Sequence, residues 1–290
     1  VGLAAFPLTP ADVAGSVRSG DMAKLVARLI GTDVCAIGVL GSTGIAAYLD
    51  RSERRLAVQA AVAACGGAKP IMAGVGALRT DQARALAMDA AEAGADWLVL
   101  SPISYTPLTQ DEAFTHYESV AAETGLPLCI YSNPGTTHFN FSRELVVRLA
   151  HLPAVKAIKM PLPADGDVEG ELSYLRAECP ADFSLGYSAD WDMNRSFEAG
   201  ADCFHSAAAG LLPKQWLALM AAGQTGDLEV QRAFEPMLDM LRTHGSLRVL
   251  YACANLMGLT DSAPPRPLLP LSDGICAHCE TAMARIADYQ

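Results

Sequence analysis

The stretch PIMAGVGALRTDQARALAMDAAEAGADWLVL, residues 70–100, contains two short apolar runs with a helical pattern between them. PIMAGV (70–75) and DWLVL (96–100) are nearly continuous in apolar residues, which is typical of strands buried on both faces of a sheet. TDQARALAMDAAEAG (80–94) has a helical pattern and ends at Gly94, a usual helix terminator. A strand, a helix and a second strand in this order predict a parallel βαβ unit.

The same alternation extends in both directions along the chain. Six further apolar runs are predicted as strands, over 3–6, 34–40, 127–131, 155–159, 183–186 and 202–206. Further helices are predicted over 50–65, 110–124, 142–150, 167–178 and 188–199. Eight near-regular units over about 210 residues favour a closed (β/α)8 TIM barrel, while a doubly wound sheet is the alternative α/β architecture. We therefore expect a catalytic barrel over 1–224 and a C-terminal helical extension over 225–290.

The bulk composition excludes several classes of partner. The chain has 290 residues, of which 51% are hydrophobic, and a net charge of −11 at pH 7. An acidic chain without a stripe of lysine and arginine is a poor ligand for nucleic acid or an anionic membrane. No apolar run reaches the roughly 18 residues that span a bilayer, and the first residues carry no basic leader pattern. We expect a cytoplasmic protein that binds a small molecule.

The eight cysteines lie in apolar contexts and predict free, buried thiols rather than disulfides. The segment CAHC (276–279) has the spacing of a redox or metal pair. A zinc site needs more ligands, and the sequence contains no second CxxC and no HxxxH. We therefore expect an amphipathic helix that carries Cys276 and Cys279, with no metal and no cofactor.

The segment AVKAIKMP (154–161) places Lys159 where an apolar run meets a turn. In parallel barrels the C-terminal ends of the strands carry the chemistry. Tyr131 is the last residue of the preceding strand, so both side chains are expected to reach the same small volume. The segment GSTG (41–44) follows the second strand and faces the same mouth.

These residue types predict imine chemistry. Burial favours the neutral form of a lysine, and a neutral amine attacks a ketone or aldehyde carbon to give a Schiff base. The protonated imine is an electron sink that needs a proton carrier beside it, for which Tyr131 is suited, with the hydroxyl of Thr43 or Ser42 as a helper. The glycines of GSTG, among them Gly44, let backbone N–H groups approach a carboxylate.

Over nearly its whole length the sequence resembles the dihydrodipicolinate synthase / N-acetylneuraminate lyase superfamily of class I, Schiff-base aldolases and dehydratases. The Y-x-x-P of YSNP (131–134) combined with the I-K of VKAIKMP (155–161) is the specific part of this resemblance. Supporting segments are PLTP (7–10), GSTG (41–44), PIMAGVGA (70–77), AGADWLVLSP (93–102), AGADCFHSAAAGLLP (199–213) and PPRPLLPL (264–271).

The resemblance implies a role for each residue of the motifs. Lys159 would form the Schiff base with pyruvate or a related 2-oxo acid, and Tyr131 would relay protons to and from the intermediates. Ser42 and Thr43 would hold the carboxylate. In the family, the backbone carbonyl of the residue that matches His205 faces the lysine. Here that position also bears an imidazole, which is either a base in the pocket or a histidine at a strand end.

Departures from the family pattern bear on the substrate. Thr136 stands where the synthase that makes the lysine precursor has an arginine, which binds the second carboxylate of its substrate. The absence of this arginine argues against the substrate of that synthase. The position of the tyrosine that completes the relay from a neighbouring subunit matches Ser104, with Tyr105 one step away. Sialic-acid lyases have acidic residues after the glycine–tyrosine of the seventh strand, where this chain has Ser188 and Ala189, so sialic acid is disfavoured.

The leading hypothesis is a class I aldolase for pyruvate or a related 2-oxo acid and an unidentified aldehyde. The alternatives are a 2-keto-3-deoxy sugar acid dehydratase with the same imine, a 4-hydroxy-tetrahydrodipicolinate synthase, and a 2-oxo-acid-binding barrel without turnover. The resemblance also implies a homotetramer or homodimer. The expected catalytic residues are Lys159, Tyr131 and Thr43. The expected substrate-binding residues are Ser42, Thr43, Gly44, Thr136, Tyr105 and His205.

Overall fold

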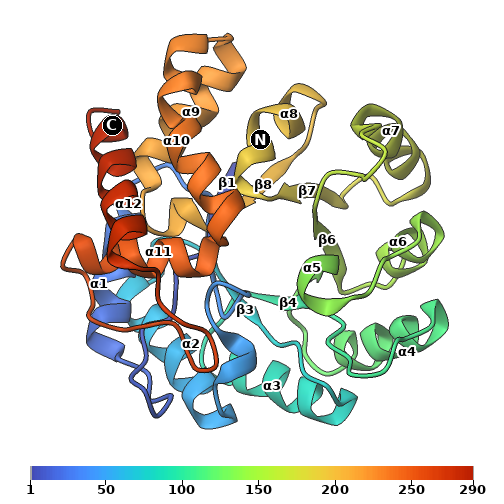
Figure 1. The fold of residues 1–290 in the computed structure, drawn as a ribbon. Coiled ribbons are helices and arrows are strands. Elements are labelled where there is room, and N and C mark those ends of the chain that lie inside the picture. Colours follow the sequence, from blue (N-terminus) through green and yellow to red (C-terminus); the bar gives the residue numbers. More distant parts are fainter. Residues whose placement is uncertain (1, 290) are drawn as a thin grey trace.

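The computed structural model describes residues 2–289, and its eight parallel strands form one closed barrel (Figure 1). The strands follow one another around the barrel in sequence order, and the first pairs with the last to close it. They are β1 Gly2–Ala5, β2 Ala36–Val39, β3 Ile71–Gly74, β4 Trp97–Leu100, β5 Leu128–Tyr131, β6 Val155–Met160, β7 Ser184–Ser188 and β8 Cys203–Ser206. The predicted TIM barrel is confirmed.

Helices follow the strands and surround the barrel (Figure 1). They are α1 Ser19–Ile30, α2 Arg51–Cys65, α3 Thr80–Glu92, α4 Gln110–Ala121, α5 Pro134–Thr137, α6 Arg143–Ala150, α7 Val168–Glu178, α8 Met193–Glu198 and α9 Pro213–Thr225. The short 3-10 helices are η1 Ala46–Tyr48, η2 Asp190–Asp192 and η3 Ala208–Gly210. α1 is not among the helices predicted from the sequence. Its buried residues nevertheless have helical spacing: Met22, Leu25, Val26 and Leu29.

The predicted helix over 188–199 is wrong at its start. Ser188 still belongs to β7, because it pairs with His205 in the barrel. The chain then turns at Ala189, whose φ of 79° lies in the left-handed region. Pairing with the neighbouring strand β8 thus extends β7 beyond the apolar run that marks it in the sequence.

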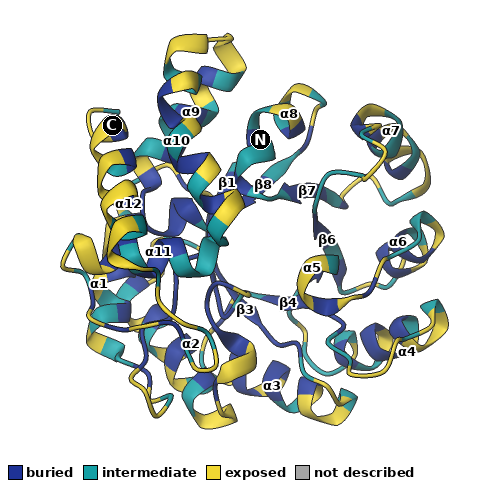
Figure 2. Cartoon of the chain, viewed as in Figure 1, coloured by how far each residue is buried: buried dark blue, intermediate teal, exposed yellow. Residues whose placement is uncertain are grey.

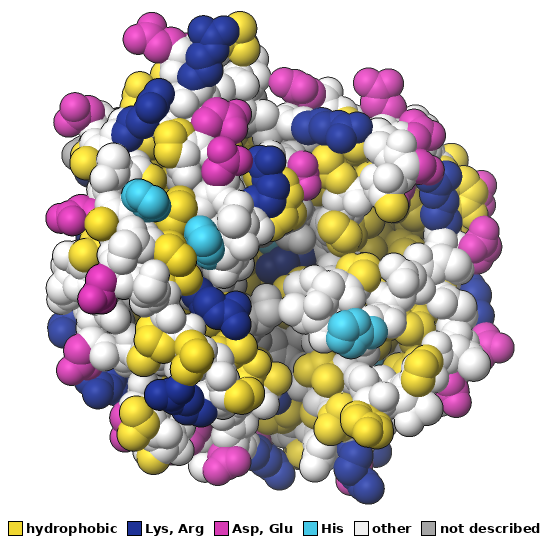
Figure 3. Space-filling model, viewed as in Figure 1, with side chains coloured by type: hydrophobic (Ala, Val, Ile, Leu, Met, Phe, Trp, Pro, Cys, Tyr) yellow, Lys and Arg dark blue, Asp and Glu magenta, His cyan; other side chains and the backbone are white. Residues whose placement is uncertain are grey.

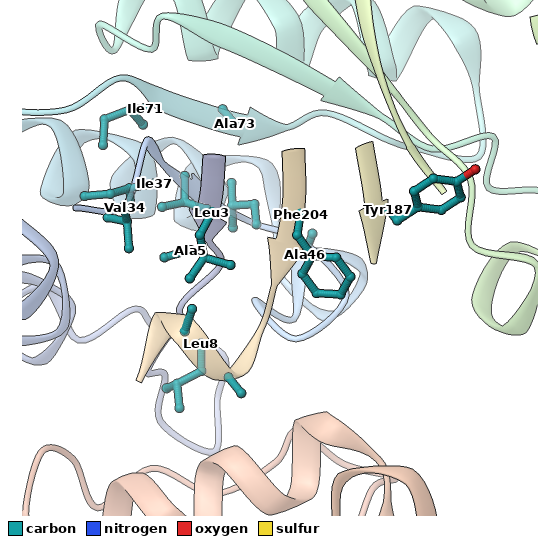
Figure 4. Packing of buried hydrophobic residues seen from close by; sticks show 14 of the residues in the cluster. Leu3, Ala5, Leu8, Val34, Ile37, Ala46, Ile71, Ala73, Tyr187 and Phe204 are labelled. Carbon is teal, nitrogen blue, oxygen red and sulfur yellow. The ribbon is translucent and has the colours of Figure 1, made fainter. Parts of the chain in front are cut away.

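Side chains alternate between the inside and the outside of the barrel, as they must in a closed sheet. On β1, Ala4 belongs to a small cluster inside the barrel, whereas Leu3 and Ala5 belong to the large core between strands and helices. Figure 4 shows Leu3, Ala5, Phe204 and Tyr187 in this outer core. The Tyr187 hydroxyl donates to Glu171 on α7, outside the barrel. The helices are accordingly buried where they face the strands and exposed on the opposite side (Figure 2).

The chain continues past α9 as α10 Leu228–His244, α11 Ser246–Leu256 and α12 Asp273–Ile286, which confirms the C-terminal helices. These helices pack on the rest of the chain: Phe234 on α10 packs against Trp216 on α9, and the Tyr251 hydroxyl on α11 donates to the carbonyl of Thr9. Within residues 2–289, no helix is long and apolar enough to cross a membrane. The division at residue 224 stays a prediction.

The cysteines are free thiols in the structure, but Cys35 is exposed and Cys179 and Cys203 are half-buried rather than buried as predicted. The CAHC segment lies in α12 as predicted, with Cys279 buried and Cys276 half-buried. The described part of the chain contains no group of three or more His, Cys, Asp or Glu side chains placed to hold a metal ion.

Candidate active site

Lys159 projects into the mouth of the barrel. Its neighbour Ile158 belongs to the outer core and Ala157 to the inner cluster, so the alternation along β6 turns Lys159 inward. The side chain is 7% exposed, and Nζ lies 3.8 Å from the ring centroid of Phe6 and 4.6 Å from that of Tyr131. Figure 3 shows that this end of the barrel is hollowed at its centre.

The rings of Phe6 and Tyr131 contact the Lys159 amine but provide no negative charge to pair with it. A ring face attracts an ammonium group but accepts no proton from it. No salt bridge joins Lys159 to a carboxylate anywhere in residues 2–289. Lys156, on the same strand, instead forms an ion pair with Asp182 at 2.8 Å. The amine of Lys159 is therefore available to a ligand, which that of Lys156 is not.

Tyr131 lies beside Lys159 because β5 and β6 pair with these two residues in register. Its hydroxyl lies 3.0 Å from the Ser42 hydroxyl and accepts a hydrogen bond of 2.9 Å from the side-chain amide of Asn133. Since the amide must donate, the phenol's own proton remains free for Ser42 or a ligand. The structure thus brings Lys159, Tyr131 and Ser42 together, as the sequence predicts.

The hydroxyl beside Tyr131 is that of Ser42 and not that of Thr43, so the catalytic role expected for Thr43 stays a prediction. Thr43 is buried, and no hydrogen bond joins its side chain to Tyr131. The turn is tight: a Cβ on Gly44 would lie 2.9 Å from the backbone nitrogen of Leu40. Only a glycine fits there without a shift of the backbone. The turn geometry, which the sequence does not reveal, decides which hydroxyl points at Tyr131.

Asn133 is a site residue that the sequence motifs do not reveal. The Y-x-x-P motif specifies Tyr131 and Pro134 and leaves the two positions between them unspecified. Asn133 precedes α5, and its carbonyl accepts hydrogen bonds from the backbone N–H groups of Thr136 and Thr137. These bonds fix the backbone of Asn133, so its amide points back to the phenol oxygen. A polar residue directly before the proline is the signal that could have identified it.

Asn133→Leu is expected to lower kcat roughly two- to tenfold, the usual contribution of one neutral hydrogen bond, with a smaller change in KM. The variant removes the only side-chain donor to the Tyr131 oxygen besides Ser42 in the described residues. Steady-state kinetics measure the change. Asn255→Leu makes the same substitution at an exposed position of α11 and should leave kcat unaltered. Equal kinetics for Asn133→Leu and the wild type would contradict the role.

His205 lies on the other side of Lys159 from Tyr131. Its ring is 5% exposed, packs edge-on against Phe6 with centroids 5.7 Å apart, and its Nδ1 has no hydrogen-bond partner. Burial, and then the charge of Lys159, lowers the pKa of His205 from 6.5 to about 3. The imidazole is therefore neutral near pH 7, so it can donate or accept a hydrogen bond but cannot act as an acid.

The lowered pKa of His205 predicts a loss of stability in mild acid. Below pH 6.5 the imidazole of the unfolded chain binds a proton, whereas that of the folded protein stays neutral until about pH 3. The free energy of unfolding therefore decreases as the pH is lowered from 6.5 to about 3. Between pH 7 and pH 5 the wild type should lose about 2 kcal/mol more than His205→Leu. Urea unfolding at the two pH values, at one protein concentration, measures this. Equal losses in the two proteins would show that His205 titrates normally in the fold.

The remaining predicted residues lie at the rim. Thr136 is exposed on α5, which lies over the inner edge of the barrel (Figure 1), and its hydroxyl donates to the Asn133 carbonyl at 3.3 Å. Tyr105 is 97% exposed in the connection between β4 and α4, and no hydrogen bond or ring contact with Lys159 or Tyr131 is found within residues 2–289. The nearby Ser104 bonds to the Thr106 carbonyl. One chain alone thus does not bring Tyr105 to Lys159.

Comparisons with known proteins point in one direction. The model of the Dihydrodipicolinate synthetase family matches residues 1–285. A crystal structure of dihydrodipicolinate synthase from Agrobacterium tumefaciens superimposes with a TM-score of 0.95 at 51% identity, over 98% of this chain and 97% of that one. The 4-hydroxy-tetrahydrodipicolinate synthase of Salinibacter ruber is 34% identical over 233 residues, covering 80% of this chain and 76% of its own. That of Alcanivorax borkumensis is 31% identical over 276 residues, covering 92% and 90%.

Proposed function

Because the chain belongs to the Dihydrodipicolinate synthetase family of Schiff-base lyases, we propose that it is a class I aldolase that acts on pyruvate or a related 2-oxo acid. The observation that carries the proposal is the buried amine of Lys159, which lies against two aromatic rings, without a carboxylate partner, beside the hydrogen-bonded hydroxyl of Tyr131. This is the arrangement that an amine nucleophile with a neighbouring proton carrier requires.

In the proposed reaction the Lys159 amine attacks the C2 carbonyl of the 2-oxo acid. Tyr131 gives a proton to the resulting hydroxyl, water leaves, and the imine forms. The imine draws electrons from C3, which gives a proton to the Tyr131 phenolate and becomes the carbon nucleophile that adds to an aldehyde. Tyr131 then protonates the new alkoxide, and water releases the product from Lys159. Ser42 exchanges protons with Tyr131, at 3.0 Å, and the 41–44 turn receives the carboxylate.

A 4-hydroxy-tetrahydrodipicolinate synthase is the second candidate, and the names of the relatives favour it. Against it stands Thr136, whose hydroxyl bonds to the backbone of its own helix at the position where the family synthase has a carboxylate-binding arginine. A threonine cannot replace the paired bonds of a guanidinium group with a carboxylate. A dehydratase for 2-keto-3-deoxy sugar acids would use the same imine on Lys159.

Borohydride trapping with pyruvate, followed by peptide mass spectrometry, tests the proposal. Reduction converts the imine into a stable secondary amine, so a pyruvyl group on the peptide that contains Lys159 is the expected result. An adduct with a longer 2-oxo acid but not with pyruvate would favour the dehydratase. The absence of an adduct with any 2-oxo acid would overturn the proposal and favour a binding barrel without turnover.

We further propose that the protein is a homodimer or homotetramer in the cytoplasm, with Tyr105 entering the site of a neighbouring subunit. The 97% exposure of an aromatic side chain supports this, because a second chain would cover it. Dilution to monomers should then lower the activity per subunit, as followed by activity assays alongside analytical ultracentrifugation. Activity per subunit that stays constant through dissociation would contradict the shared site.

A further inference from the structure

His205 reaches the neighbourhood of Lys159 because the strand between them carries no side chain at that level. Lys159 on β6 pairs with Gly186 on β7, and β7 pairs with β8, which carries His205. A Cβ on Gly186 would lie only 2.6 Å from Nε2 of His205. The imidazole therefore occupies the space above Gly186. Lys159 is flanked by the phenol of Tyr131 from β5 and by this imidazole from β8.

The imidazole is a buried polar group that the protein itself leaves unsatisfied. The ring is 5% exposed, Nδ1 has no hydrogen-bond partner, and no hydrogen bond involves either ring nitrogen within residues 2–289. Burial of a polar group without a partner costs free energy, which an apolar side chain at this position would avoid. A neutral imidazole has one donor and one acceptor nitrogen. Nε2, which lies above Gly186, is the nitrogen that a ligand in the mouth could reach.

The placement of the ring identifies the part of the ligand that it meets. In an imine with Lys159, C2 of the 2-oxo acid is bonded to Nζ, to the carboxylate carbon and to C3. The carboxylate belongs over the 41–44 turn, and Phe6 stands between that turn and the imidazole. A Cβ on Gly41 would lie 3.3 Å from the Phe6 ring, and the same ring packs edge-on against His205. Tyr131 approaches C2 from the opposite side of Lys159. Of the three groups bonded to C2, C3 is therefore the one that points toward His205.

We propose that His205 forms a hydrogen bond with an oxygen on C3 of the bound 2-oxo acid, so that the preferred donor is a 3-hydroxy-2-oxo acid. The inference rests on the proposed function, because it places the ligand as an imine on Lys159. It narrows the substrate class from 2-oxo acids in general to those with a hydroxyl group next to the reacting carbonyl.

Two probes of nearly equal size test this proposal: hydroxypyruvate, which has the C3 hydroxyl, and 2-oxobutyrate, which has a methyl group in its place. Each protein is offered both at equal, limiting concentrations with borohydride, and mass spectrometry gives the ratio of the two adducts on Lys159. The two ketones differ in their intrinsic reactivity, but this difference affects the adduct ratio of the wild type and of the variant equally, so it cancels when the two ratios are compared. The ratio should favour hydroxypyruvate roughly three- to tenfold more in the wild type than in His205→Leu, as for one neutral hydrogen bond.

His151→Leu is the matched control, since His151 is exposed at the end of α6 and should leave the adduct ratio at the wild-type value. His205→Phe takes the place of the leucine variant if the latter does not fold, which circular dichroism shows. Equal ratios in the wild type and the His205 variant would overturn the role of the imidazole. The absence of both adducts in the wild type would instead refute imine formation, so the two failures are distinct.

Discussion

Lys159→Ala is expected to abolish the borohydride-trapped adduct with pyruvate and to reduce turnover to background. On β6, Lys159 carries the amine that lies in the mouth, whereas Lys156 is held in an ion pair at 2.8 Å from Asp182. Intact-mass and peptide mass spectrometry after reduction measure the adduct. The fold should persist, since the variant removes a buried cationic group that has no carboxylate partner.

Lys156→Ala is the matched control for this experiment. It removes the same side chain three residues earlier on the same strand, where the ammonium group is partly exposed. The adduct yield on Lys159 should then equal that of the wild type. Adduct formation by Lys159→Ala at the wild-type level would refute the assignment of the nucleophile, and loss of the adduct in Lys156→Ala would point to a general effect on the strand.

Tyr131→Phe is expected to slow turnover by roughly 10²–10⁴-fold, the contribution of a positioned acid–base group. The phenyl ring keeps the aromatic face that lies 4.6 Å from the Lys159 amine, while the variant loses the hydroxyl that bonds to Ser42 and Asn133. Pyruvate binding should therefore change little, and single-turnover kinetics should show slow imine formation. A loss of less than about tenfold would assign the proton transfers to another group.

Tyr187→Phe provides the comparison for the loss of a tyrosine hydroxyl. Tyr187 also lies at the end of a barrel strand and is fully buried, but its hydroxyl donates to Glu171 on α7, outside the barrel. Its removal should lower the free energy of unfolding while leaving kcat within about twofold, because a lost hydrogen bond of this kind affects the fold alone. A large fall in kcat for this variant would show that strand-end hydroxyls act indirectly.

The amino-acid sequence by itself predicts the barrel and the proximity of the two residues at the centre of the proposed site. Apolar runs mark all eight strands, because a strand covered on both faces needs near-continuous apolar side chains. Lys159 and Tyr131 end two consecutive runs, and parallel strands that follow one another in a barrel are neighbours, so their proximity follows from the strand order alone. These inferences depend on local patterns and on one topological rule.

Other features of the site depend on the tertiary structure, because they arise between residues distant in the sequence. The hydroxyl of Ser42 rather than Thr43 meets Tyr131, although 89 residues separate the pair, because a tight turn aims one side chain and not its neighbour. The imidazole of His205 lies beside Lys159 because Gly186, on the strand between them, leaves the space empty. Local sequence patterns determine strands and their order, whereas the direction of each side chain depends on the packing of the closed barrel.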